Sequence, residues 1–331
     1  MALVDRSPKY SKTQDNWSNT RLYYIEKGDY PDNDGTYWVN VTGYDELNMA
    51  APSSLGWFIT TVQMYFPSDY LFLSLWDHNW GWHPGWFQKD LTSNADTMKY
   101  SDISEELKKI NGSKIDIVGY DACVSSHVEV LHTWRPYSEY FVGSQDYIGW
   151  GGVDYSRVVG SVYNASTIGP RELSIDIAES ILTDSADHCS SAISLGDDFD
   201  SLVMYISKLA SLFIKYLESI RERLILIRDS VPSVPHYPSD EYHKDIFGLA
   251  LAVRESLSEF PDLVEAADSI LRVMNSIVLY NKVSGWSCRE GKGLSIYWPK
   301  SNTFKSLNDS EEYLKLSFSQ ASSWDEFLIL F

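Results

Sequence analysis

The chain has few cysteines, a deficit of basic residues and no long apolar run, and each shortage excludes a class of protein. Three cysteines among 331 residues are an odd, low number, which argues against a disulfide framework and leaves at least one thiol free. A free thiol fits a reducing compartment or a nucleophile. Only 27 Lys and Arg face 46 Asp and Glu, a formal net charge of −19. Nucleic acids and anionic membranes bind clustered positive charge, so we expect neither as a partner, and a cationic substrate suits this charge better.

No stretch of about 18 apolar residues is present, and the first residues lack a basic segment followed by an apolar one. We therefore expect a soluble chain without a signal peptide, cytoplasmic as it stands and secreted if the N-terminus is truncated. The composition, 44% apolar and 14% aromatic, is that of a folded globular protein of one large domain or two modest ones.

The spacing of apolar residues predicts an α/β fold. Strands alternate with helices over the first 195 residues, which is typical of a mostly parallel sheet flanked by helices. From residue 196 onward helical spacing dominates, with helices expected at 199–228, 244–259 and 262–281 and one strand, about 293–298, returning to the core. The sequence thus predicts two domains, 1–195 and 196–331.

Two apolar runs of strand length each end in a reactive side chain. The first starts at Leu71 and ends at His78, and the second starts at Lys114 and ends at Cys123, where a helical pattern over 125–134 follows. Parallel strands place their carboxyl ends at one edge of a sheet. A thiol that opens a helix there lies near N–H groups and a positive dipole, which stabilise thiolate, and a nearby histidine can transfer protons. This pair is the smallest set that cysteine peptidase chemistry needs.

Other candidate sites are weaker. Histidine pairs at 78 and 83 and at 127 and 132 are five residues apart, which on a helix places the rings on different faces, so we predict no metal site. The segment from Asp29 to Gly35 resembles a calcium loop, but Tyr30 and Val41 occupy positions that require carboxylates, so it is interpreted as a turn. No cofactor is expected, and calcium has no support. The tryptophans fit either a binding wall or packing around a loop: Trp76, Trp80, Trp82 and Trp86.

The two motifs that end at His78 and Cys123 also resemble those of a known family. The motif from Leu75 to His78 with Gly81-Trp82, followed by Gly119-Tyr-Asp-Ala-Cys123, resembles the two catalytic motifs of the clostripain family of cysteine peptidases, which belongs with caspases, gingipains, legumains and separases. Supporting similarity extends over roughly residues 2–331, at four further short segments: 45–49, 152–155, 190–193 and 293–299. The resemblance implies a caspase-like sheet, although the family's opening strand and helix have no counterpart here.

The resemblance also implies roles for individual residues. Cys123 would be the nucleophile and His78 the general acid and base. The backbone N–H groups of Cys123 and Asn79 would form the oxyanion hole. The family usually has glycine after the histidine, whereas this chain has Asn79, which tolerates positive φ less freely.

Substrate recognition follows from the same carry-over. Asp121 would lie at the base of the S1 pocket, with Trp150 and Gly151 beside it, and would pair with a P1 Arg or Lys through charge-assisted hydrogen bonds. A carboxylate at a helix N-terminus is the structural alternative for Asp121. Members with strict basic specificity carry a further acidic residue where this chain has Trp150 to Gly152. Lys89 and Lys99 lie where family members cleave themselves.

The resulting hypothesis is a cysteine endopeptidase that acts on peptides or proteins, cutting after Arg or Lys through the dyad of Cys123 and His78 and an acyl-enzyme. The alternative is a catalytically inactive caspase-like binding protein with a Trp-lined groove, in which Asn79 and the missing N-terminal elements have disabled the site.

Overall fold

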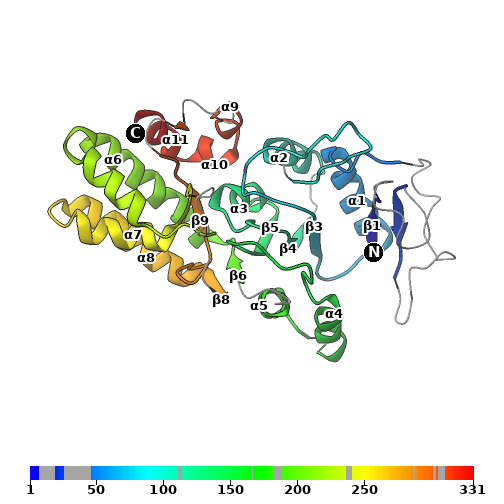
Figure 1. Cartoon of the computed structure of the whole chain (residues 1–331). Coiled ribbons are helices and arrows are strands. Elements are labelled where there is room, and N and C mark those ends of the chain that lie inside the picture. Colours follow the sequence, from blue (N-terminus) through cyan, green and yellow to red (C-terminus); the bar gives the residue numbers. More distant parts are fainter. Residues whose placement is uncertain are drawn as a thin grey trace. The chain divides into compact units, whose positions relative to one another are not determined.

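The structure is a computed structural model, and it describes residues 1–6, 19–25, 46–85, 87–110, 114–165, 167–181, 188–235, 241–285, 288–300, 303–304 and 310–331 (Figure 1). The segment from Asp29 to Gly35 lies outside the described residues. The chain forms two compact units, residues 1–69 with 85–113 and residues 70–84 with 114–331. The domain boundary at residue 195 stays a prediction.

Among its described residues, the smaller unit has two short strands and two helices. β1 (Ala2–Val4) pairs antiparallel with β2 (Arg21–Tyr23). Helix α1 (Pro52–Tyr65) begins with a proline, whose fixed φ suits a first helical turn, and buries its leucine and isoleucine positions at 55 and 59. Helix α2 (Tyr100–Lys109) has a buried face built in the same way.

The larger unit is built on a five-stranded sheet with the order β3-β4-β5-β6-β8. β3 (Phe72–Trp76), β4 (Ile115–Asp121) and β5 (Ser138–Gly143) are parallel, whereas β6 (His188–Ser194) and β8 (Val278–Ser284) add antiparallel pairs. The sheet is therefore mixed, with its parallel half at β3, β4 and β5. All seven residues of β4 are buried, as expected of a parallel strand covered on both faces.

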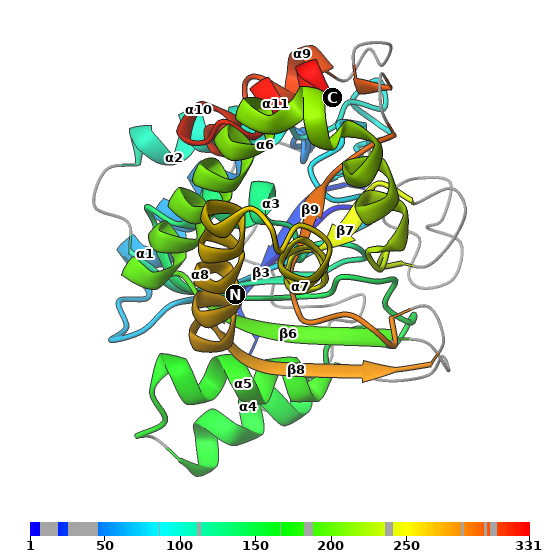
Figure 2. The same cartoon turned by 90° about the vertical axis from the view of Figure 1, so that its left-hand side faces the viewer.

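Helices cover the sheet. α4 (Tyr155–Asn164) and α5 (Pro170–Ser180) lie on one side of β6 and β8 in Figure 2, with α7 (Ile246–Ser256) and α8 (Pro261–Ile277) on the other. An apolar cluster joins α5 to the sheet through Ile177, Ala178, Ile117 and Val142. The α/β class with flanking helices is confirmed.

The rest of the chain is mainly helical. α6 (Asp197–Ser230) opens with acidic residues, which interact favourably with the helix dipole, and it ends before Pro232. Three short helices follow later: α9 (Ser310–Tyr313), α10 (Ser317–Ala321) and α11 (Trp324–Leu330). No helix in the described part of the chain is both long and apolar enough to cross a membrane.

One strand was missed. The sequence predicts helix over 262–281, but α8 ends at Ile277 and the next residues form β8, which pairs with β6. Val278, Leu279 and Tyr280 suit either element, and the free edge of β6 decides between them. The strand expected near 293–298 exists as β9 (Ser295–Tyr297), but it pairs with β7 (His243–Asp245) outside the five-stranded sheet.

Candidate active site

The two predicted reactive loops leave neighbouring strands at the same level. In the parallel register of β3 and β4, Trp76 is paired with Asp121. His78 follows Trp76 by two residues and Cys123 follows Asp121 by two residues. The carboxyl ends of both strands therefore deliver the imidazole and the thiol to one edge of the sheet, as the sequence predicts. The His78 side chain is exposed and that of Cys123 is half-buried.

Hydrogen bonds tie the two loops together. The N–H of Gly81 donates to the carbonyl of Val124 (2.8 Å), and the side-chain amide of Asn79 donates to the same oxygen (3.2 Å). Val124 has φ +48°, an unfavourable conformation for a β-branched residue, and its side chain is buried. A strained residue directly after a candidate nucleophile is typical of a functional turn.

The expectation that Cys123 opens a helix is wrong. Helix α3 (Val128–Trp134) begins five residues later, so its dipole does not act on the thiol. Instead, the N–H groups of Val124, Ser125 and Ser126 donate to carbonyls of the segment after β5. Burial raises the pKa of the Cys123 thiol, and the negative charges of Asp146 and Asp121 add to the effect. The thiol therefore needs a base to become a nucleophile.

Asn79 fits its position without backbone strain. The described non-glycine residues with positive φ are Gln88, Asn94, Ala95 and Val124, and Asn79 is not among them. Its side chain is buried and anchors the loop to Val124. The replacement of the family's glycine by asparagine thus leaves the turn after His78 intact.

Asp121 is a buried carboxylate at the carboxyl end of β4, with 4% of its surface exposed. The Tyr155 hydroxyl donates to its Oδ2 (3.1 Å), and since that proton is used, Ser74 Oγ donates to the Tyr155 oxygen (2.8 Å). Its Oδ1 accepts no hydrogen bond from the residues that the structure describes. Burial raises the pKa of Asp121, which the Val153 N–H and the Tyr155 hydroxyl partly offset. Asp121 lies outside any helix, so the helix-capping alternative does not apply.

The loop from Gly149 to Gly152 borders this carboxylate. Gly152 has φ +57°, and a Cβ at this residue would lie 2.4 Å from Asp121 Oδ1. Glycine is therefore required both by the backbone conformation and by the close approach. Gly151 is exposed, and Trp150 is 96% exposed. Tyr155, which sequence reasoning missed, is held here because α4 starts at this residue.

The tryptophans differ in their environments. Trp82 is buried against Tyr297 and Tyr313, so it belongs to the core. Trp80 is half-buried, and its indole N–H donates to the Tyr242 hydroxyl (2.9 Å). Trp76 is 72% exposed, and Trp86 lies outside the described residues. The packing interpretation therefore holds for Trp82.

A buried polar network lies behind the histidine loop. His243 Nδ1 and His127 Nε2 share a hydrogen bond (2.8 Å), and His127 Nδ1 lies 3.5 Å from a Glu129 carboxylate oxygen. The ring centroids of His243 and Trp80 lie 5.7 Å apart, with the two rings nearly perpendicular at 74°. Burial and the neighbouring histidines lower the pKa of His243. Sequence reasoning missed this network because its partners come from α3 and from β7, more than a hundred residues later.

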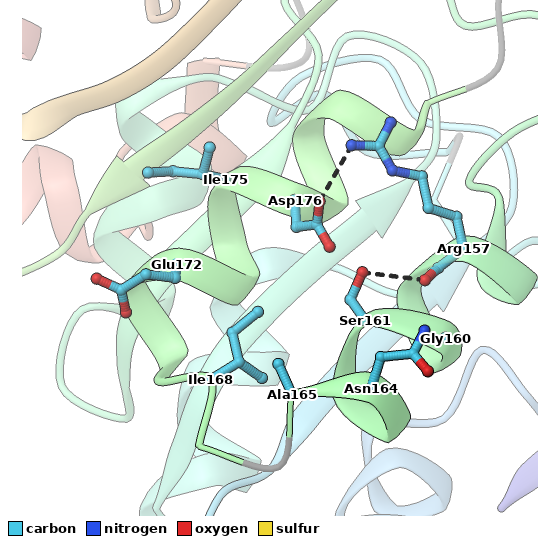
Figure 3. Close-up of a pocket in the computed structure, with 9 residues that line it drawn as sticks. All are labelled: Arg157, Gly160, Ser161, Asn164, Ala165, Ile168, Glu172, Ile175 and Asp176. Carbon is cyan, nitrogen blue, oxygen red and sulfur yellow. Dashed lines mark hydrogen bonds and ion pairs between the residues drawn. The ribbon is translucent and has the colours of Figure 1, made fainter.

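A shallow pocket lies elsewhere on this unit, between α4 and α5 (Figure 3). Its volume is about 620 Å³, and Arg157 crosses its rim to pair with Asp176 (3.0 Å). Ile168 and Ile175 supply an apolar part of the lining. None of the predicted catalytic residues lines this pocket.

Among the described residues, two groups of side chains have the donor atoms that metals bind. In the smaller unit, carboxylate oxygens of Asp5, Glu46 and Asp90 lie within 4.8 Å of one another. Burial and the two neighbouring carboxylates raise the pKa of Asp5 to about 6. In the larger unit, Asp146, Cys189 and Cys288 form a buried group of the same size. The expectation that no cofactor is needed stays a prediction.

A family model described as the clostripain family matches residues 13–329 of the chain. Clostripain of Hathewaya histolytica is 29% identical over 161 residues, a match that covers 41% of this chain and 29% of the relative. The chain thus matches less than a third of that relative's length.

Solved structures resemble the fold. A secreted C11 cysteine protease from Bacteroides thetaiotaomicron, in complex with an irreversible peptide inhibitor, superposes with a TM-score of 0.66 at 20% identity, covering 95% of this chain and 91% of that one. An inactive zymogen C11 protease from Parabacteroides distasonis gives a TM-score of 0.63 at 21% identity, covering 92% and 83% of the two chains. At these identities the likeness shows the fold.

Proposed function

The chain belongs to the clostripain family, and from this premise we propose that it is a cysteine endopeptidase that cuts peptide bonds after Arg or Lys. The predicted membership of the clostripain family is confirmed. The observation that carries the proposal is the register of β3 and β4, which brings His78 and Cys123 to one edge of the sheet beside the buried carboxylate of Asp121.

The reaction begins with proton transfer. His78 takes the proton of the Cys123 thiol, and the thiolate sulfur attacks the carbonyl carbon of the scissile bond. The raised pKa of Cys123 makes this base necessary. The N–H groups of Cys123 and Asn79 stabilise the oxyanion of the tetrahedral intermediate. His78 then protonates the leaving amine, and the acyl-enzyme remains on sulfur.

Hydrolysis completes the cycle. His78 takes a proton from a water molecule, and the resulting hydroxide attacks the thioester carbonyl. The carbon–sulfur bond then breaks, the carboxylic acid product is released, and His78 returns its proton to the Cys123 sulfur. The exposure of His78 fits this role, because its imidazole must reach thiol, amine and water in turn.

The preference for a basic P1 residue is supported by the electrostatics around Asp121. Its Oδ2 is held by Tyr155, and its Oδ1 is buried beside Gly152 without a hydrogen bond from the described residues. A buried, incompletely paired carboxylate is costly, and a guanidinium or ammonium group removes that cost. The net charge of −19 adds long-range attraction for cationic peptides.

Self-cleavage is a further part of the proposal, and the structure favours one of the two lysines. The Lys99 carbonyl accepts hydrogen bonds from the N–H groups of Asp102 and Ile103 in the first turn of α2, so that bond is held in a helix start. Lys89 is exposed in the preceding irregular segment. Proteolysis favours exposed, irregular backbone, so we propose Lys89 as the cleavage position.

The experiment is a comparison of kcat/KM on fluorogenic peptides that differ only at P1, with Arg, Lys or Ala. The wild type should cleave the Arg and Lys peptides and leave the Ala peptide nearly intact. Cys123→Ala and His78→Ala should abolish turnover, since each removes a member of the dyad. His132→Ala is the matched control, because His132 bonds Ser317 away from the dyad and should keep its activity.

The outcomes separate the hypotheses. Loss of cleavage in both dyad variants, with the control active, supports the proposal. A wild type that binds Arg peptides without cleaving them would instead favour the inactive binding protein. Cleavage that survives Cys123→Ala would refute the assigned nucleophile.

A further inference from the structure

Two cysteines that take no part in the proposed chemistry meet in the core. Cys189 lies on β6, and Cys288 lies four residues after the end of β8. Both side chains are buried, and together with Val234 they form a small apolar cluster. Their sulfur atoms and a carboxylate oxygen of Asp146 all lie within 4.8 Å of one another.

The surroundings of Cys288 argue against a metal-bound thiolate. Its Sγ lies 2.8 Å from the carbonyl oxygen of His188 and 3.1 Å from that of Ser284. Two carbonyl dipoles point their negative ends at this sulfur, and the Asp146 carboxylate adds a further negative charge nearby. A neutral Cys288 S–H group donates to these carbonyls, whereas a thiolate there has no proton to donate. The hydrogen bond with Cys189 lowers the pKa of Cys288, and burial raises the pKa of Cys189, so Cys189 is held neutral and a pair of metal-bound thiolates is disfavoured.

We propose that Cys189 and Cys288 form a disulfide when the chain folds in an oxidising medium. This bond covalently joins β6 to the segment after β8. It also explains the odd cysteine count, because pairing these two leaves Cys123 as the single free thiol. The inference stands apart from the proposed peptidase activity, since it depends only on the two buried sulfurs.

The reaction balances with a low-molecular-weight disulfide as the oxidant. Each cysteine loses its S–H proton, one Sγ–Sγ bond forms, and the oxidant's S–S bond is reduced by two electrons to two thiols. Both cysteines are buried in the folded chain, so the exchange takes place during folding or after local opening. The product closes a loop of about 100 residues, which strongly restricts the unfolded chain.

The cysteine pair connects with the candidate active site through the Ser144–Ile148 segment. Ser144 Oγ lies 3.9 Å from Cys189 Sγ. Two residues later, the Asp146 carbonyl accepts the N–H of Val124 (2.9 Å), and the Ile148 carbonyl lies 4.0 Å from Cys123 Sγ. A disulfide between Cys189 and Cys288 thus restrains the part of the core that contacts the loop of Cys123. It should stabilise this loop and leave the Cys123 thiol free.

The test is to refold the reduced, denatured full-length chain in reduced or in oxidised glutathione. Thiols are then counted with Ellman's reagent in guanidinium, and unlabelled digests are mapped by mass spectrometry. Oxidation should lower the thiol count of the wild type from three to one and that of Cys123→Ala from two to none. One disulfide-linked species should contain the peptides with residues 189 and 288. Its mass should be lower by two hydrogen atoms than the summed masses of the two reduced peptides.

Stability supplies the second measurement. The oxidised wild type should melt at least about 5 °C above the reduced form, and added dithiothreitol should abolish the difference. Cys189→Ser combined with Cys288→Ser is the control and should melt at one temperature in both media. If this double variant does not fold, the peptide map of the wild type still decides.

Three free thiols after oxidative refolding would overturn the proposal. A disulfide-linked peptide that contains Cys123 would also overturn it. The same holds if the protein contains one equivalent of zinc and if a chelator, by removing the zinc, makes both buried thiols reactive.

Discussion

Substitution of Gly152 by alanine tests the placement of Asp121 in the substrate pocket. The new methyl carbon would lie 2.4 Å from Asp121 Oδ1 and 2.8 Å from Oδ2, distances at which something must move. The backbone of Gly152 is part of a turn with φ +57°. The carboxylate is therefore the group expected to shift, and its hydrogen bond from Tyr155 is expected to break.

Two effects contribute to the expected loss of stability in Gly152→Ala. An L-residue in the left-handed region costs about 1–2 kcal/mol. Loss of a hydrogen bond to a charged group costs about 1.5–3 kcal/mol more. Gly152→Ala should therefore reduce the free energy of unfolding by about 2.5–5 kcal/mol. If the displaced carboxylate also loses its contact with a P1 cation, kcat/KM for Arg and Lys peptides should fall roughly ten- to hundredfold.

Gly85→Ala is the matched control. Gly85 also has positive φ, at +90°, but a Cβ there would meet nothing within 4 Å. Backbone strain should reduce the free energy of unfolding of this variant by only about 1–2 kcal/mol. Its kcat/KM should equal that of the wild type. Urea unfolding and initial rates on Arg, Lys and Ala peptides measure both quantities. The reasoning that the Gly149–Gly152 loop and Asp121 form the S1 pocket would be refuted by two results together. Gly152→Ala would be as stable as Gly85→Ala, and both variants would keep the kcat/KM of the wild type.

Three further predictions concern single residues. Because burial raises the pKa of Cys123, its alkylation by iodoacetamide should be slow at pH 7 and should rise about tenfold per pH unit into the alkaline range; a rate that levels off below pH 8 would contradict this. Glu129→Ala removes the acceptor of the Tyr297 N–H and the Tyr313 hydroxyl in the core, and should cost about 3–5 kcal/mol in urea unfolding; a cost under about 1 kcal/mol would show that the network is dispensable. Arg157→Met breaks exposed ion pairs with Asp176 and Glu179, so stability should fall by no more than about 1 kcal/mol and kcat/KM should stay unchanged; a larger loss of stability would contradict the surface interpretation.

Much of the fold was predictable because its signals are local. The apolar runs that end at His78 and Cys123 are continuous in sequence, and prolines at 52, 170 and 261 mark the first turns of three helices. Elements whose identity depends on a distant partner were harder. β8 became a strand because β6 offered it an edge, and its own residues suit a helix nearly as well.

The same distinction applies to the candidate site. The motifs around His78 and Cys123 point to the chemistry because cysteine and histidine at the ends of two strands suffice to suggest a dyad. The structure alone brings Tyr155 to Asp121, since the two are 34 residues apart and lie on different elements. No helix starts at Cys123, although the sequence predicts one there. The chain instead forms a strained turn at Val124, which is held by hydrogen bonds to the segment after β5.

The sequence by itself determined the family, the fold class and the reactive residue types, because these are written in consecutive residues and in charge. The tertiary structure decided which buried groups face one another: Asp121 with Tyr155 and Gly152, and Cys189 with Cys288. Such contacts depend on the closing of loops of tens to hundreds of residues around a packed core, and no short-range pattern records them.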